Sequence, residues 1–224
     1  MQYRWLLVVL AGCATAGSEA NEQAAVDAAV TRVDAPMSPP IPVDAPPPPP
    51  CMATAMKQLL VNPAFDATPA GTGWTQTPVD PAFPIITSDD GLAEKSPAMK
   101  AWMGGYAQAN ANDQLFQDVT IPANTAKLRL TGFYSVVTTE AAGAAVKDTA
   151  SIELTQVGGT SIDKLLAVNN TMTTATWTAI DYTVANVTGL SGTTVRFSLQ
   201  TSNDASAHTN FYFDSLVLTA THCP

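Results

Sequence analysis

The chain has 224 residues, of which only 13% are charged, and 19 acidic against 10 basic residues give a formal net charge of −9. This charged share is roughly half of that in an average soluble protein. A nucleic-acid-binding protein is excluded because it needs a basic surface and the basic residues do not cluster. Two histidines and three cysteines leave little material for a zinc site or a histidine-based triad.

Residues 1–13 have the pattern of a short secretory signal. Arg4 precedes the apolar run 5–10, and small residues follow it up to Cys13. The run is too short to cross a bilayer, which takes roughly 20 residues. The sequence Leu-Ala-Gly-Cys resembles a bacterial lipobox, which implies that Cys13 carries acyl chains such as palmitate and anchors the protein in the membrane. The alternative is a plain signal peptide followed by a chance cysteine.

The resemblance to a lipobox also implies a location. Ala14, rather than aspartate, follows the cysteine, and in a Gram-negative bacterium this predicts delivery to the outer membrane. We therefore expect a lipid-anchored protein of the bacterial cell envelope, at the outer membrane or the cell surface.

Residues 14–50 predict a disordered linker rich in Ala, Asp and Pro. The segment shows no apolar periodicity and ends in five consecutive prolines at 46–50. Proline fixes φ and donates no hydrogen bond, so an extended or polyproline II stalk is expected. A helix over 19–33 is the weaker alternative.

Residues 51–224 have the length of one domain. Cys51 opens this region and Cys223 nearly closes it. If Cys13 is acylated, these two form an even pair in an oxidising compartment, and we expect a disulfide. Such a bond places the first and last strands side by side. Two free thiols are the alternative.

The domain reads as a series of strands. Apolar and polar residues alternate with period two between turn residues, and no segment keeps a 3.6-residue period for three turns. The pattern predicts an all-β protein, an antiparallel β-sandwich of about eight to ten strands. The clearest predicted strands are 115–121, 126–134, 151–155, 177–184, 194–200 and 211–219.

Four motifs in order resemble the galactose-binding-like jelly rolls that include carbohydrate-binding modules. The resemblance covers about residues 60–219 and implies a jelly-roll fold and a binding role without catalysis. Two features depart from it: we expect no catalytic domain beside this one, and Asp66 replaces the usual glutamate. The motifs are Asn-Pro-Ala-Phe-Asp at 62–66 with Trp74, the stretches 101–106 and 113–122, Leu-Ser-Gly at 190–192, and 211–218.

The same resemblance implies a structural calcium site between Asp66 and Asp214, completed by carbonyl oxygens near Asn62. By strict alternation, Asp214 shares a face with Tyr212, Leu216 and Leu218. The opposite face, with Phe211, Phe213 and Val217, is equally apolar, so the pattern leaves open which of the two points inward. A carboxylate among apolar neighbours needs a partner or a metal, and calcium takes six to eight oxygen ligands. The alternative is that Asp214 caps a turn or pairs with a lysine.

Aromatic and amide residues suggest a sugar-binding site. Sugars stack their C–H faces on aromatic rings while their hydroxyls need hydrogen-bond partners. The alternative is that the tryptophan lies in the core and that the Asn and Asp residues form ordinary turns. The candidate ligand-binding residues are Trp102, Tyr106, Asn112, Asp113, Glu140 and Asp148.

Catalysis has the weakest support. His208 lies two and four residues from Ser206 and Asp204, and neighbours on one loop do not form a nucleophile–base–orienter chain unaided. We therefore expect no enzyme but a binding or adhesion module for a carbohydrate or a surface partner. The alternatives are a structural envelope protein with protein–protein contacts only, and a hydrolase.

Overall fold

The computed structural model describes residues 54–224, so the predicted signal peptide, the linker, Cys13 and Cys51 lie outside the described residues. In the described part, eleven strands are present and no helix is long and apolar enough to span a membrane. The strands are β1 (Ala55–Gln58), β2 (Thr75–Thr77), β3 (Ile86–Thr87), β4 (Lys100–Gly104), β5 (Gln114–Thr120), β6 (Thr125–Thr138), β7 (Thr149–Gln156), β8 (Ser161–Asn169), β9 (Thr178–Thr183), β10 (Thr194–Ser202) and β11 (Thr209–His222).

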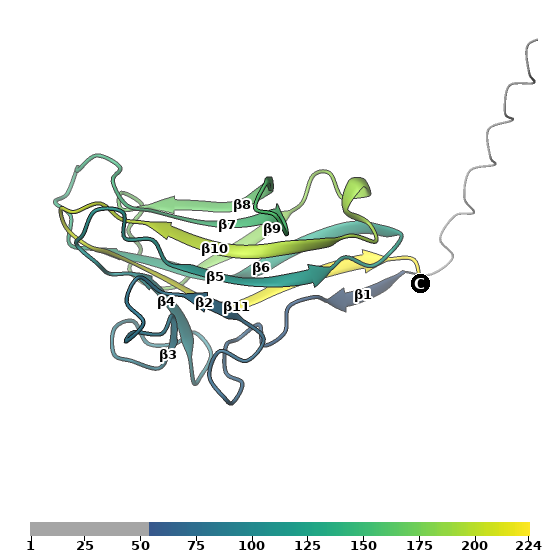
Figure 1. Cartoon of the computed structure of the whole chain (residues 1–224), viewed down its shortest axis with the longest axis horizontal. Helices are drawn as coiled ribbons and strands as arrows, with labels where there is room; N and C mark the ends of the chain where they lie inside the picture. Colours follow the sequence, from purple (N-terminus) through teal and green to yellow (C-terminus); the bar gives the residue numbers. More distant parts are fainter. Residues whose placement is uncertain (1–53) are drawn as a thin grey trace, which may run out of the picture. The chain divides into compact units, whose positions relative to one another are not determined.

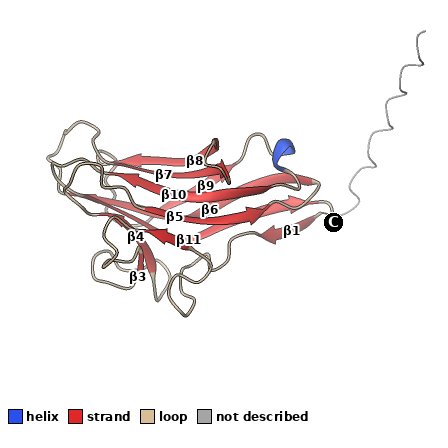
Figure 2. Cartoon of the chain, viewed as in Figure 1, coloured by secondary structure: helices blue, strands red, loops and turns tan. Residues whose placement is uncertain are grey.

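Two antiparallel sheets make up the domain (Figure 1). The first has the order β3-β4-β11-β6-β9, with β1 also paired to β11, and the second has the order β2-β5-β10-β7-β8. The connections are loops apart from one 3₁₀ turn at Thr188–Leu190 (Figure 2). The predicted antiparallel β-sandwich is confirmed. The very short strands β2 and β3 lie in a region for which the sequence pattern gave no strand.

The core lies where the alternation predicts it. Leu128 and Leu130 of β6 are fully buried, whereas Arg129 between them is exposed and pairs with Asp181 of β9. On β10 the inward residues are Val195, Phe197 and Leu199. Each such side chain contributes about 1.5–3 kcal/mol when fully buried, so β6 in one sheet and β10 in the other both add to the core between the sheets.

A bulge in β11 corrects the predicted faces of that strand. The register against β6 shifts between Asp214 and Val217, where Ser215 has a φ of 53°. Before the bulge Phe213 points into the core, and after it Leu216 does. The inward-facing residues therefore have odd numbers before the bulge and even numbers after it. Asp214 therefore does not share a face with Leu216. Strict alternation wrongly grouped Asp214 with Leu216 and Leu218, because a bulge leaves no mark in the pattern of apolar residues.

The two ends of the domain lie together, as expected. β1 pairs antiparallel with the last part of β11, with Ala55 opposite His222. Cys223 is disulfide-bonded, and Cys51 lies outside the described residues, so the pairing of these two cysteines stays a prediction.

Candidate ligand-binding site

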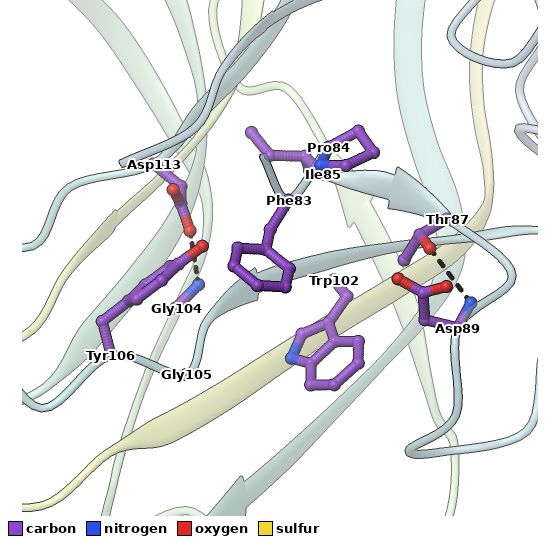
Figure 3. A pocket seen from close by; sticks show the side chains of 10 residues that line it. All are labelled: Phe83, Pro84, Ile85, Thr87, Asp89, Trp102, Gly104, Gly105, Tyr106 and Asp113. Carbon is purple, nitrogen blue, oxygen red and sulfur yellow. Dashed lines mark hydrogen bonds between the residues drawn. The ribbon is translucent and has the colours of Figure 1, made fainter. Parts of the chain in front are cut away.

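A hollow of about 250 Å³ opens at the end of β4 (Figure 3). One wall comes from the segment 83–89, which includes β3, and the other from β4 and the turn that follows it. Aromatic rings and acidic groups share this lining. The lining residues are Phe83, Pro84, Ile85, Thr87, Asp89, Trp102, Gly104, Gly105, Tyr106 and Asp113.

Two glycines shape the floor of the hollow. Gly104 has a φ of +71°, and a Cβ there would lie 2.5 Å from the carbonyl oxygen of Thr209. The next residue, Gly105, has a φ of +82° and donates its N–H to that same carbonyl. Only glycine combines this conformation with so close an approach. The turn brings Tyr106 to the same hollow as Trp102.

Trp102 is half-buried and serves both the fold and the hollow. Its Nε1 donates to Asn210 Oδ1 at 2.9 Å, and its ring lies 5.5 Å from that of Tyr212 at an angle of 39°. A buried indole N–H needs such a partner. Because β11 fixes the indole in this way, the part of Trp102 that lines the hollow is held in one orientation.

Phe83 is the aromatic wall that the sequence reasoning missed. Its side chain is 59% exposed, and it is presented by a tight turn in which Asp80 Oδ1 accepts the N–H of Ala82 and the Asp80 carbonyl accepts that of Phe83. Such turns are typical of Asp next to Pro81. The sequence did carry a signal for an exposed ring, since a phenylalanine in a turn flanked by prolines lies at the surface.

Asp89 supplies a carboxylate at the rim. Its N–H donates to Thr87 Oγ1 and its carbonyl accepts Lys100 Nζ at 2.7 Å, whereas none of the hydrogen bonds of the described residues uses its carboxylate oxygens. Lys100 is only 1% exposed and also pairs with Glu94 at 3.2 Å. The buried ammonium of Lys100 therefore fixes the backbone at Asp89 and leaves the Asp89 carboxylate free to bind a ligand. Neither Asp89 nor Lys100 was among the predicted site residues.

Asp113 lies at the hollow but acts inside the protein. It is 3% exposed, and its Oδ1 and Oδ2 each accept one N–H at 2.7 Å, from Val79 and Gly104. Burial raises the pKa of Asp113, and these two hydrogen bonds partly oppose that shift. We assign it a positioning role, because both oxygens are used by the backbone. The exposed Asn112 lines a different, polar hollow beside Gln114 and Gln200.

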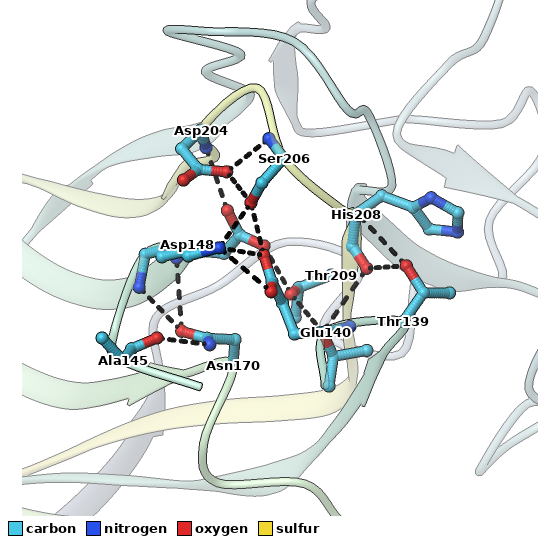
Figure 4. A network of polar contacts seen from close by, with 11 residues as sticks. Thr139, Glu140, Ala145, Asp148, Asn170, Asp204, Ser206, His208 and Thr209 are labelled. Atoms are coloured by element: carbon cyan, nitrogen blue, oxygen red, sulfur yellow. Dashed lines mark hydrogen bonds and ion pairs between the residues drawn. The ribbon is translucent and has the colours of Figure 1, made fainter. Parts of the chain in front are cut away.

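Glu140 and Asp148 belong to a separate network (Figure 4). Asp148 is fully buried, and its oxygens accept the N–H of Asp204 and the hydroxyl of Thr209. A side chain with no exposed surface does not contact a ligand directly, so Asp148 orders the loops instead. Glu140 pairs with Lys147 and borders another hollow. The two residues are therefore not brought to the hollow of Trp102 and Tyr106.

The loop with the suggested catalytic residues does not assemble a triad. The Ser206 hydroxyl is hydrogen-bonded to Glu140, Asp204 and Lys147. Figure 4 shows the ring of His208 pointing away from Ser206. The backbone N–H and carbonyl of His208 pair with Thr139. The geometry that nucleophilic catalysis requires is therefore not formed by these residues.

Asp66 and Asp214 do meet, at the segment 95–99. Asp214 is fully buried; its Oδ2 accepts the N–H groups of Lys95 and Ser96, and its Oδ1 contacts the Ser96 and Ser215 hydroxyls. Asp66 Oδ1 accepts the N–H of Met99. These carboxylates are bound by hydrogen-bond donors.

This arrangement does not fit the predicted calcium site. The Asn62 side chain is used as well, since it accepts the N–H of Ala67 and donates to the Thr72 carbonyl. Calcium prefers six to eight oxygen ligands, and here it would have to displace N–H donors. Within residues 54–224, no group of three or more His, Cys, Asp or Glu residues is placed to hold a metal. In this structure Asp66 and Asp214 are held by hydrogen bonds from the segment 95–99.

Neither a protein-family model nor a curated protein matches the sequence. Among solved structures, the carbohydrate-binding module TmCBM61 in complex with beta-1,4-galactotriose aligns over 72% of this chain and 97% of its own, with 14% identity and a TM-score of 0.44. A CBM28 module specific for non-crystalline cellulose aligns over 70% and 93%, with 11% identity and a TM-score of 0.48.

A third similar structure is the xylan-binding domain CBM22-1 of Xyn10C from Paenibacillus barcinonensis. It aligns over 74% of this chain and 96% of its own, with 17% identity and a TM-score of 0.42.

Proposed function

We propose that the domain is a non-catalytic carbohydrate-binding module that a bacterium displays on its envelope. The observation that carries the proposal is the hollow at the end of β4, where three aromatic rings and one unpaired carboxylate face the same space (Figure 3). Sugars need both kinds of group, because their C–H faces stack on rings and their hydroxyls need acceptors.

Each part of the hollow has a role in this proposal. Phe83 and Trp102 offer apolar surface for a pyranose ring, and the rim carboxylate of Asp89 accepts hydroxyl protons. The volume of about 250 Å³ is below the roughly 300–1,000 Å³ of pockets that enclose a drug-sized ligand. The hollow therefore suits one ring of a glycan, with the rest of the chain outside it.

Replacing Phe83 tests the proposal with little risk to the fold, because this ring is mostly exposed. We expect Phe83→Ala to weaken glycan binding about two- to tenfold, since an aromatic contact contributes roughly 0.5–1.5 kcal/mol. A glycan array identifies the ligand, and calorimetry measures the change. Val146→Ala, also at an exposed apolar residue (56% exposed) but outside the hollow, is the matched control. Binding that survives Phe83→Ala unchanged, or an array without any signal, would contradict the proposal.

Display on the envelope is the second part of the proposal, and the sequence around Cys13 supports it. Acyl chains on this cysteine would anchor the protein at about 0.8 kcal/mol per buried CH₂ group, and the proline-rich segment 14–50 would act as a spacer. We expect Cys13→Ser to abolish labelling by radioactive palmitate and to move the protein out of the membrane fraction. Labelling that persists in this variant would show that Cys13 is not the anchor.

A further inference from the structure

Acidic residues, and no basic ones, line the hollow and its neighbour. Asp89 and Asp113 line it. On the other side of Tyr106, a neighbouring hollow is lined by Asp80 and shares Tyr106 with the first. None of the residues that line these two hollows is a lysine or an arginine. The space beside the rings is therefore acidic as well as aromatic.

Neither Lys100 nor Lys95 presents its ammonium group to the hollow. Lys100 is 1% exposed and does not line the hollow; its ammonium is bound by the Asp89 carbonyl and by Glu94. The Lys95 ammonium lies over the ring of Phe133, 4.5 Å from its centre. The pKa of the Tyr106 hydroxyl is raised, first by burial and then by the negative charges of Asp113 and Asp80.

We propose that the glycan bound here carries a protonated amino group, which lies against the rings of Phe83, Trp102 and Tyr106 with Asp89 as its counter-charge. This inference rests on the proposed function and specifies its ligand class. The electron-rich face of an aromatic ring attracts a cation, most strongly for tryptophan. A carboxylate without an internal partner completes the site, since it forms a charge-assisted hydrogen bond with an ammonium group.

Neutral and acidic sugars use this site less well. A neutral sugar stacks on the rings but gains nothing from the local charge, and a uronic acid or a sulfated sugar meets carboxylates without a basic partner. The domain as a whole strengthens the preference, because residues 54–224 contain 14 acidic and 8 basic residues. An amino sugar is therefore the class of ligand whose binding both the aromatic rings and the negative charge favour.

The test compares three matched probes by calorimetry at mildly acidic pH and low salt. These are a β-1,4-linked tetramer of glucosamine, its fully N-acetylated counterpart and the corresponding glucose tetramer. We expect the amino tetramer to bind about tenfold or more tightly than either neutral one. The advantage should shrink with added salt and with a rise in pH that deprotonates the amine.

Asp89→Asn separates the site from general attraction to an acidic protein. This variant should lose most of the amino tetramer's advantage, whereas Asp90→Asn, which removes the same charge one residue away from the lining, should keep it. Equal loss in both variants, or none in either, overturns the inference. Neutral probes that bind as tightly as the amino probe also overturn it but leave the carbohydrate-binding function standing. Failure of all three probes overturns the inference as well, and the glycan array then decides the function separately.

Discussion

Asp113→Asn is expected to destabilise the domain by about 2–4 kcal/mol, although the two side chains have the same shape. Each carboxylate oxygen of Asp113 accepts a backbone N–H, one from Val79 and one from Gly104. An asparagine has only one acceptor oxygen, so its NH₂ group must face one of these fixed donors. A buried donor left unpaired costs roughly 1–3 kcal/mol, and the lost hydrogen bond to a charged group adds to it.

Urea unfolding measures this change, with Asp90→Asn as the control. Asp90 is exposed, and a surface substitution of this kind stays within about 0.5 kcal/mol of wild type. Asp113→Asn should also weaken glycan binding more than its loss of stability explains, because Gly104 lines the hollow and Val79 precedes the turn that presents Phe83. A variant as stable as Asp90→Asn would show that the two N–H groups find other partners.

Much of the sandwich could be predicted because alternation follows from burial on one face. Residues 194–200 and 126–134 were recognised as strands, and they match β10 and β6. Among the strands that the pattern did not predict, β8 is an edge strand, and its apolar residues do not alternate regularly. The grouping of Asp214 with Leu216 was wrong because the bulge at Ser215 depends on pairing with β6. The period-two alternation of apolar residues predicts where strands lie, whereas the position of a bulge depends on tertiary contacts.

The candidate site was predictable only in part, for a related reason. Trp102 and Tyr106 were recognised because they flank two glycines on one continuous stretch of chain. Phe83 and Asp89 reach the hollow from a loop whose position depends on the buried Lys100, and such a long-range contact leaves no local pattern. Asp148 was misplaced because a loop aspartate looks the same in sequence whether it is exposed or, as here, fully buried.

Asp214→Ala is expected to have the largest effect, a loss of about 3–5 kcal/mol, but Asp214→Asn should cost only about 1 kcal/mol. The alanine variant leaves the N–H groups of Lys95 and Ser96 unpaired in the interior. In the asparagine variant, one oxygen can still accept both N–H groups. The remaining partners are the hydroxyls of Ser96 and Ser215, which can rotate to accept from the NH₂ group. The same substitution is therefore mild at 214 and harmful at 113.

The pH dependence of stability, compared between the wild type and Asp214→Asn, shows whether hydrogen bonds or a metal ion hold Asp214. Burial raises the pKa of Asp214, and the N–H groups of Ser96 and Lys95 partly oppose the shift. The folded state then holds the proton more tightly than the unfolded chain, so this group's stability contribution is complete below the ordinary pKa and falls as pH rises through the raised one. Urea unfolding should show the wild type's advantage over Asp214→Asn largest at and below about pH 4, since the ordinary pKa is 3.8, and smaller at neutral pH. A calcium ion would reverse this sign because it binds the ionised carboxylate, and EDTA would then lower the melting temperature. We expect EDTA to leave it unchanged, because Asp214 already accepts the N–H groups of Lys95 and Ser96.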